Sequence, residues 1–373
     1  MSKRRVHLLA PSLEPHDAVS TDVLGMAQVL SEAGYDVRVF AGRHQGLAGG
    51  VELLDDAPRK CWSSSDAVLI YHHSMGWPEG EAVLLSTRNR RIVRYHNITP
   101  PHFFARYSEP HWEACTAGVA ATARMAGIHD ALFLSDSSFN CEELAVLGAP
   151  RARCLTLPPF HPTAALAATP FDQEALRTFH DGRVNILFVG GIKPNKGHEK
   201  ALRAFAAYRR WANPDCRLIF AGPIDPRLAG YREALDDLIM RLALTDHVLF
   251  TGAVPPARLR SLYASADLFL STSEHEGFGV PLVEAMFFRV PILAWGVTAV
   301  PETVGDAGML WERYDDALFA ESMEACIERR ELARFLAEKG AIRYQERYRP
   351  EALKGRLLAI LEQVVEGGLP GRN

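Results

Sequence analysis

Glu276-Gly-Phe-Gly-Val-Pro-Leu-Val-Glu284 has a carboxylate at each end and holds two glycines and a proline between them. The short apolar run Asp267-Leu-Phe-Leu-Ser271 precedes it and has the length of a buried strand. Pro281 can occupy the first position of a helix, where its missing N–H has no partner to lose. We therefore expect a strand, a glycine-rich turn and a helix, with Glu276 in the turn and Glu284 in the first turn of the helix.

This turn has the chemistry of a ligand site. Gly277 and Gly279 allow a ligand to approach the backbone closely, and the N-terminus of the helix offers N–H groups and partial positive charge. Carboxylates accept hydrogen bonds from adjacent hydroxyl groups, so a sugar ring or a ribose would suit Glu276 and Glu284. The simpler alternative is a solvated loop glutamate and a helix glutamate favoured by the dipole.

The composition is that of an ordinary globular protein. The 373 residues are 48% hydrophobic and 23% charged, with a net charge of −4, so nothing indicates nucleic-acid binding. No run approaches the roughly 18 apolar residues of a membrane span, and the N-terminus does not resemble a signal peptide. The six cysteines are scattered without a C-x-x-C pair, which favours reduced thiols in a cytoplasmic protein.

Short apolar strands alternate with helical patterns along the whole chain, which predicts parallel α/β sheets. A segment rich in proline, alanine and threonine at residues 155–169 marks a connection between two domains. We expect a first domain at 1–170, a second at 183–345, and a last helix at 350–367 that packs back on the first. The predicted strands are 6–10, 37–41, 67–71, 91–96, 131–134, 153–157, 184–189, 216–221, 248–251, 268–271 and 291–294. The predicted helices are 22–32, 112–125, 139–147, 198–212, 226–242, 256–265, 315–339 and 350–365.

The first strand of the second domain leads into Val189-Gly-Gly-Ile-Lys-Pro-Asn-Lys-Gly197, which opens a helix. Gly190 and Gly191 leave the backbone accessible, and Lys196 supplies a positive charge for a diphosphate. An ordinary exposed turn is the alternative.

The segment from Ser273 to Met286 resembles the E-x7-E signature of family-4 retaining glycosyltransferases. The resemblance implies the α/β GT-B fold, in which two Rossmann-like, doubly wound domains face each other across a cleft. The loop at 189–197 is similar to the Gly-Arg-x5-Lys-Gly loop of that family, in which arginine and lysine hold the donor diphosphate. Lys196 matches the lysine, whereas Gly191 stands at the position of the arginine.

The resemblance also implies roles for single residues. Glu284 would hold the ribose hydroxyls, Lys196 would neutralise the leaving diphosphate, and Glu276 with Gly277, Phe278 and Gly279 would hold the donor sugar. Gly222 and Val254 follow two strands at positions where the base and ribose would lie.

His96 ends a strand of the first domain, where a family histidine orients the donor sugar. A structural histidine bonded to the backbone is the alternative for His96. A metal site with His72 and His73 is not supported by the spacing.

These residues predict a retaining glycosyltransferase that moves a hexose from a nucleotide diphosphate sugar, GDP- or UDP-linked, to a glycan or polyprenyl-linked acceptor. Analogy with bacterial enzymes that build surface polysaccharides favours mannose. The chain has no D-x-D motif, so we expect catalysis without a metal or other cofactor. A nucleotide-sugar epimerase on the same scaffold and a non-catalytic nucleotide-sugar-binding protein are the alternatives.

The segment Pro101-His-Phe-Phe-Ala-Arg-Tyr-Ser-Glu-Pro-His-Trp112 mixes aromatic rings with Arg106 and histidines. Aromatic rings with polar tips suit a membrane interface, and arginine can meet the phosphate of an acceptor. We therefore expect a cytoplasmic enzyme with weak peripheral contact to the inner face of the cell membrane. The alternative is that these rings pack the core of the first domain.

Overall fold

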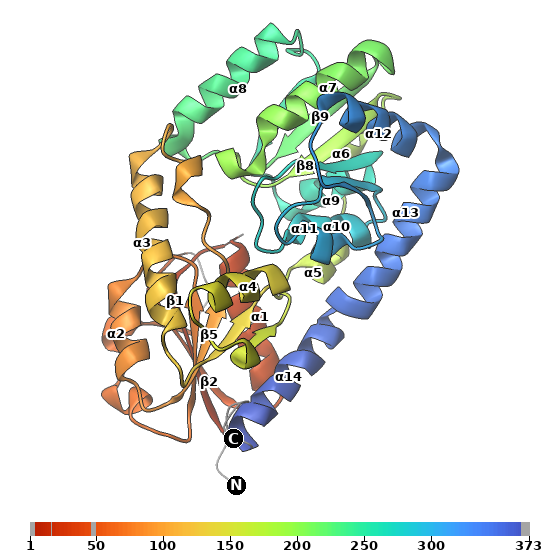
Figure 1. Ribbon diagram of the computed structural model, residues 1–373. Helices are drawn as coiled ribbons and strands as arrows, with labels where there is room; N and C mark the ends of the chain where they lie inside the picture. The colour runs from red at the N-terminus through yellow and green to blue at the C-terminus, as the bar shows by residue number, and fades with distance from the viewer. Residues whose placement is uncertain (1–3, 16, 46–49, 367–373) are drawn as a thin grey trace. The chain divides into compact units, whose positions relative to one another are not determined.

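The computed structural model describes residues 4–15, 17–45 and 50–366, and these form two compact units (Figure 1). The first unit contains the described parts of Met1–Pro101, Trp112–His161 and Pro350–Asn373. The second contains His102–His111 and Pro162–Arg349. The second unit thus includes the aromatic segment 102–111, which the sequence assigns to the first domain.

The first unit is built on a seven-stranded parallel sheet in the order β3-β2-β1-β4-β5-β6-β7, as far as its residues are described. Successive side chains of a strand point to opposite faces. Val6 and Leu8 of β1 accordingly belong to one core cluster and Leu9 to another. The strands are β1 (Arg5–Leu13), β2 (Asp36–His44), β3 (Val51–Leu53), β4 (Val68–His73), β5 (Arg90–Tyr95), β6 (Leu132–Ser135) and β7 (Cys154–Thr156).

Helices cover the first sheet, and the last helix of the chain is one of them. Leu353, Leu357 and Leu361 repeat every four residues on α14 (Pro350–Glu366) and are buried in the same cluster as Val6 and Leu8. α14 lies beside α1 (Ala18–Glu32), as Figure 1 shows. The remaining helices that reach into this unit are α2 (Pro78–Ser86), α3 (Glu109–Ala126) and α4 (Ser138–Val146).

The second unit repeats the design with a six-stranded parallel sheet, in the order β10-β9-β8-β11-β12-β13 among the described residues. Its strands are β8 (Val184–Val189), β9 (Cys216–Ala221), β10 (Val248–Gly252), β11 (Leu268–Ser271), β12 (Ile292–Trp295) and β13 (Met309–Trp311). Its helices are α5 (Thr163–Ala168), α6 (Gln173–Phe179), α7 (His198–Trp211), α8 (Ala229–Arg241), α9 (Pro256–Ala264), α10 (Val280–Phe287), α11 (Val300–Val304), α12 (Asp316–Glu328) and α13 (Arg330–Arg343). The prediction of two Rossmann-like α/β domains is confirmed.

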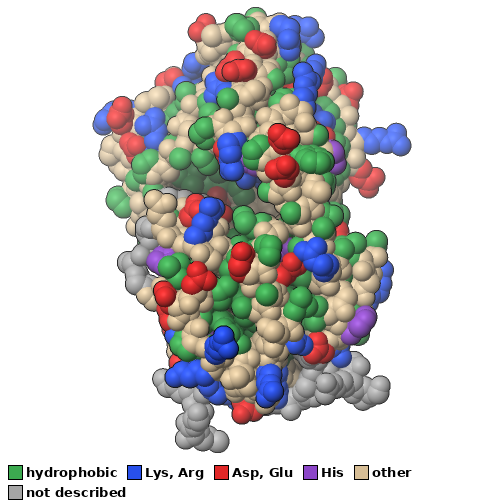
Figure 2. Space-filling model, turned by 90° about the vertical axis from the view of Figure 1, so that its left-hand side faces the viewer, with side chains coloured by type: hydrophobic (Ala, Val, Ile, Leu, Met, Phe, Trp, Pro, Cys, Tyr) green, Lys and Arg blue, Asp and Glu red, His purple; other side chains and the backbone are tan. Residues whose placement is uncertain are grey.

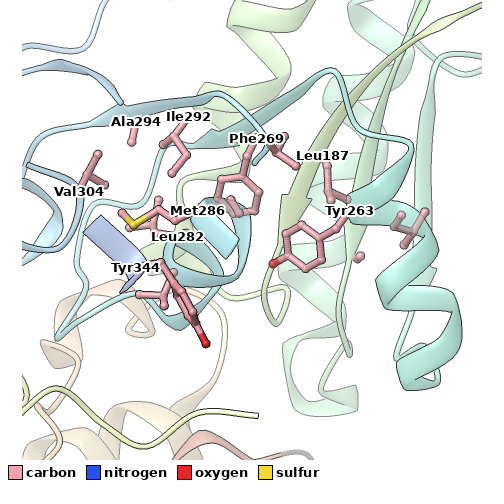
Figure 3. Packing of buried hydrophobic residues seen from close by; sticks show 14 of the residues in the cluster. Leu187, Tyr263, Phe269, Leu282, Met286, Ile292, Ala294, Val304 and Tyr344 are labelled. Atoms are coloured by element: carbon pink, nitrogen blue, oxygen red, sulfur yellow. The ribbon is translucent and has the colours of Figure 1, made fainter. Parts of the chain in front are cut away.

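The helix that carries Glu284 is fixed by its apolar face. Leu282 and Met286 of α10 are buried in one cluster with Phe269 of β11 and Ile292 of β12, and Figure 3 shows these side chains packed together. This packing holds the start of α10 against the carboxyl end of the sheet, where ligands bind in such folds.

Several details differ from the sequence prediction, although every predicted strand has a counterpart. The helix expected at 315–339 is two helices, because Arg329 leaves the helical conformation with φ −87° and ψ 86°. Glu284 is the fifth residue of α10, beyond its first turn. The structure also adds β3 and β13, whose three residues each are too few to show a periodic pattern.

On the face that Figure 2 shows, basic and acidic side chains are interspersed. This face offers no continuous basic stripe for a nucleic acid. No described helix is both long enough and apolar enough to cross a membrane.

Candidate functional site

Lys196 and Glu276 form an ion pair in the second unit. Nζ of Lys196 lies 2.6 Å from Oε1 of Glu276, and the side chains are only 19% and 13% exposed. The hydroxyl of Ser273 donates a hydrogen bond of 2.8 Å to the same Oε1. The structure thus brings together the candidate cation of one loop and the candidate carboxylate of the other.

The pairing of β8 with β11 explains why these loops meet. The two strands are neighbours in a parallel sheet, so the loops that follow them leave the sheet at the same edge. Gly197 has φ +69°, and a Cβ atom there would lie 2.1 Å from the carbonyl oxygen of Thr272. Thr272 Oγ1 donates to the Gly197 carbonyl over 2.8 Å. Only glycine permits this close contact between the two loops.

The glycines after β8 and β9 differ in the space around them. A Cβ atom on Gly222 would lie 2.0 Å from the carbonyl oxygen of Gly190, so Gly222 is required by the packing of two strand ends. A Cβ atom on Gly191 would meet nothing closer than Cε of Lys193 at 3.6 Å. The position where the family resemblance expects arginine therefore has room for a side chain.

The glycine-rich turn before α10 contributes backbone to the site. Gly279 has φ +92° and precedes the first residue of the helix. The backbone N–H of Glu276 donates to Thr298 Oγ1 over 3.0 Å, and Thr298 has φ +54°, a conformation that β-branched residues rarely adopt. Strain of this kind is common at functional sites. Sequence reasoning missed Thr298, which follows β12 and carries no recognisable local signal.

The side chains of Phe278 and Val254 pack in the hydrophobic core. Phe278 is buried and lies edge-on to Tyr348, with ring centroids 5.6 Å apart. Val254 is partly buried against the same cluster. If these two residues contact a ligand, they do so through backbone atoms.

Glu284 is 5% exposed, and Tyr263 of α9 donates a hydrogen bond of 2.7 Å to its Oε2. Burial raises the pKa of Glu284 to about 7, and the hydrogen bond from Tyr263 opposes part of this shift. The carboxylate is thus held in one orientation and is close to its titration point at neutral pH. Sequence reasoning missed Tyr263, which lies on another helix 21 positions away.

His96 follows β5 in the first unit and is held on both sides of its ring. Its Nε2 lies 2.9 Å from Nδ1 of His72, and its Nδ1 lies 3.3 Å from Oδ2 of Asp136. Asn97 has φ +67° directly after it. Side chains, rather than the backbone, therefore fix the orientation of the His96 ring. His73 is separate, with Nε2 2.8 Å from Thr122 Oγ1.

Buried charges support this histidine pair. Arg94 Nε donates to Asp22 Oδ2 over 2.9 Å, and Nη2 of Arg94 lies 2.6 Å from Asp136 Oδ1. Burial alone would raise the pKa of Asp22, but the positive charge of Arg94 outweighs it and lowers that pKa. Sequence reasoning missed these three residues. The sequence does contain one sign of this cluster, because Arg94 is a charged residue inside the apolar strand Ile92-Val93-Arg94-Tyr95.

Asp22, His72 and His96 also gather potential metal-ligand atoms within 4.8 Å of one another, which the sequence spacing did not predict. The oxygens of Asp22 are already in use, because Oδ1 accepts from the N–H of Phe160 at 2.7 Å and Oδ2 from Arg94. The guanidinium charge of Arg94 would also repel a second cation. The group fits a hydrogen-bonded support for His96 better than a metal site.

Comparison with known proteins relates part of the chain to a described family. Residues 172–343 match the family model described as glycosyl transferases group 1, and this range contains Lys196, Glu276 and Glu284. The chain is 33% identical to O-antigen chain mannosyltransferase B of Escherichia coli over 144 residues, which are 37% of this chain and 36% of that protein. It is 26% identical to a D-inositol 3-phosphate glycosyltransferase of Thermobispora bispora, over 92% of this chain and 89% of the relative. The matches to the first three relatives span 36–45% of the length of those proteins.

Solved structures share the fold over nearly the whole chain. Sucrose-phosphate synthase from Thermosynechococcus elongatus superposes with a TM-score of 0.76 at 17% identity, covering 97% of this chain and 99% of that one. Anabaena HepE in complex with UDP-glucose gives a TM-score of 0.74 at 17% identity, covering 96% and 99%. The glycosyltransferase WaaG gives 0.70 at 16%, covering 97% and 100%. Residues 172–343 are thus similar to the group 1 glycosyl transferases, which agrees with the family-4 resemblance of the E-x7-E segment, and the chain as a whole has the GT-B fold of these solved structures.

Proposed function

We propose that this protein is a retaining glycosyltransferase that transfers a hexose from a nucleotide diphosphate sugar to a glycan or lipid-linked acceptor. The ion pair between Lys196 and Glu276 carries the proposal. It joins a cation two residues before α7 to a carboxylate four residues before α10, and Glu284 lies farther along α10. A diphosphate, a sugar ring and a ribose are the groups that such an arrangement can bind.

In the proposed reaction the bond between the anomeric carbon and the diphosphate oxygen breaks, and the electron pair leaves with the diphosphate. Lys196 stabilises the charge that develops there. The acceptor hydroxyl forms the new bond on the same face and gives its proton to the departing phosphate. Glu276 Oε1 accepts from Lys196 and Ser273, so we expect this carboxylate to orient the donor sugar rather than to attack it. This favours direct front-face substitution.

We propose that no divalent metal takes part. Support comes from the lack of a D-x-D motif in the sequence and from the half-buried position of Lys196. An ammonium group and helix N-termini can stabilise the negative charge of the leaving diphosphate, as a metal ion does in other enzymes.

The proposed donor sugar is mannose on GDP, with a UDP sugar as the alternative. The name of the E. coli relative, a mannosyltransferase of O-antigen chains, supports mannose and a polysaccharide product. The complex of Anabaena HepE with UDP-glucose shows that a protein of this fold accepts a UDP sugar.

We also propose cytoplasmic function with weak peripheral membrane contact, because a polyprenyl-linked acceptor lies at the membrane surface. The exposed Trp112, at 41%, is the ring of the aromatic segment best suited to this contact, whereas Phe104 is buried. Co-sedimentation with anionic liposomes, comparing wild type with Trp112→Ser, tests it. Equal recovery of both proteins in the supernatant counts against the contact.

Incubation with a panel of GDP and UDP sugars, with and without glycan and polyprenyl-linked acceptors, tests the function. We expect nucleotide diphosphate release that an acceptor accelerates, and NMR of the product should show the anomeric configuration of the donor. Conversion of the donor to an epimer without release would favour the epimerase. Nucleotide binding without either reaction would favour a binding protein.

A further inference from the structure

A pocket lies beside the Lys196–Glu276 pair, within the second unit. Its volume is about 730 Å³, and it is bounded by the first turns of α7, the start of α12, Tyr231 of α8 and the segment His102–His111. Neither Lys196 nor Glu276 lines it, but their close chain neighbours Gly197 and Glu274 do. No residue of α10 lines it, so it is separate from the position of Glu284. Its volume is in the usual range of about 300–1,000 Å³ for small-molecule sites.

Aromatic side chains form much of the wall of this pocket. They are Phe103, Tyr107, Tyr231 and Tyr314. Tyr107 lies edge-on to Tyr231 with ring centroids 5.0 Å apart, and Phe103 packs on His102 at 4.3 Å. Burial and the nearby carboxylate of Glu199 raise the pKa of Tyr107, so its hydroxyl stays protonated. Rigid rings with polar tips can pack against the C–H face of a pyranose and bond its hydroxyls.

The charged residues of the wall favour a ligand rich in hydroxyl groups over an anion. Four carboxylates line the pocket, against one lysine and one arginine: Glu199, Glu274, Asp315, Asp316, Lys200 and Arg203. Lys200 is already paired with Glu274, at 2.8 Å. Asp316 accepts a hydrogen bond from Tyr314 over 2.7 Å. Excess negative charge repels phosphate and carboxylate groups, whereas carboxylates accept readily from sugar hydroxyls.

We propose that this pocket binds sugar residues of the acceptor glycan, and that these are neutral or amino sugars without phosphate or carboxylate groups. The inference rests on the proposed transfer reaction. Gly197, at the end of the loop that carries Lys196, and Glu274, near the start of the loop that carries Glu276, both line the pocket, so a glycan held there would extend from the site of transfer. The segment His102–His111 supplies two of the aromatic rings, which gives this aromatic stretch a role in glycan recognition.

The test measures saccharide binding and transfer separately. Calorimetric titration with neutral oligosaccharides and with matched uronic-acid or phosphorylated ones gives the ligand class, without a donor. Phe103→Ala and Tyr107→Ala are each expected to weaken neutral oligosaccharide binding and to raise the acceptor KM by about tenfold, the loss of one aromatic contact. The donor KM should change much less. Phe335→Ala is the matched control, because Phe335 is an exposed ring on α13 of the same unit and does not line the pocket.

Three results would overturn the proposal. The first is binding and acceptor KM within about twofold of wild type in both variants. The second is tighter binding of the anionic saccharides. The third is a saccharide that binds in the pocket and changes donor turnover without being extended, which would make it an effector. If the wild-type protein turns over no donor, the proposed function is refuted. The titrations would still show whether the pocket binds neutral saccharides.

Discussion

Lys196 Nζ lies 2.6 Å from Glu276 Oε1, although the two residues are 80 positions apart in the chain. The pair is only partly exposed, so each charge depends on the other in the absence of a ligand. When a diphosphate binds, its negative charge competes with Glu276 for Lys196. Donor binding is therefore expected to loosen the ion pair and to free Glu276 for the sugar hydroxyls.

Lys196→Ala should depress turnover, because Gly191 leaves Lys196 as the principal cation expected at the leaving diphosphate. Loss of such electrostatic stabilisation costs about 3 kcal/mol, or roughly a hundredfold in kcat. Single-turnover rates at saturating donor measure the effect, with Lys339→Ala as a control on a lysine of the same unit that is paired with Asp306. An unchanged rate would assign the charge to another residue such as Lys193.

Glu284→Gln should weaken nucleotide binding, because a buried carboxylate loses the charge that strengthens its hydrogen bonds to a ribose. We expect a loss of about 1.5–3 kcal/mol by calorimetry. Tyr263→Phe should cause a smaller loss, since it removes only the hydrogen bond that orients Oε2. Full affinity in Glu284→Gln would mean that this glutamate only packs the helix.

Stability should depend on pH through Glu284. Burial raises its pKa to about 7 from the ordinary value of 4.5, so the folded protein holds a proton that the unfolded chain releases at lower pH. The free energy of unfolding should therefore be highest below about pH 4.5 for this group and fall by about 3 kcal/mol as pH rises to 7. Urea unfolding of wild type and Glu284→Gln at several pH values measures the difference. Burial also raises the pKa of Glu143 to about 7. Glu143 therefore lowers the free energy of unfolding with rising pH in both proteins, and the difference between them reports on Glu284.

The same titration predicts the pH dependence of ligand binding. Nucleotide affinity should rise with pH up to about 7 and then level off, because the ionised carboxylate is the stronger acceptor. Glu284→Gln should remove this rise. A rise that persists in the variant would assign it to another group.

Much of the site was predictable because its signals are local. The turn Glu276–Gly279 and the loop that ends at Lys196 each follow a strand and open a helix, so spacing alone predicts their places. Tyr263 and Thr298 could not be predicted, because each reaches the site from another element through tertiary packing. The break between α12 and α13 at Arg329 lacks the glycine or proline that usually marks a helix end.

Metal independence can be tested directly. Exhaustive treatment with a chelator should leave transfer within about twofold of the untreated rate, because Lys196 and helix N-termini are expected to neutralise the leaving group. Lys196→Ala gives a second measurement, since added Mg²⁺ should not restore its rate. Activity that a chelator abolishes and Mg²⁺ or Mn²⁺ restores would contradict the prediction.

Gly191 and Gly222 form a matched pair for the last prediction. A Cβ atom on Gly191 has only ordinary contacts, at 3.6 Å or more, whereas one on Gly222 would lie 2.0 Å from the Gly190 carbonyl oxygen. Gly191→Arg should therefore keep the thermal unfolding midpoint within a few degrees and tighten diphosphate binding, because a guanidinium can bind phosphate oxygens in bidentate fashion. Gly222→Ala should lower the midpoint by several degrees, since the backbone at Gly190 must move. Equal destabilisation by both changes would show that the loop at Gly191 is packed too tightly for the arginine that the family resemblance expects there.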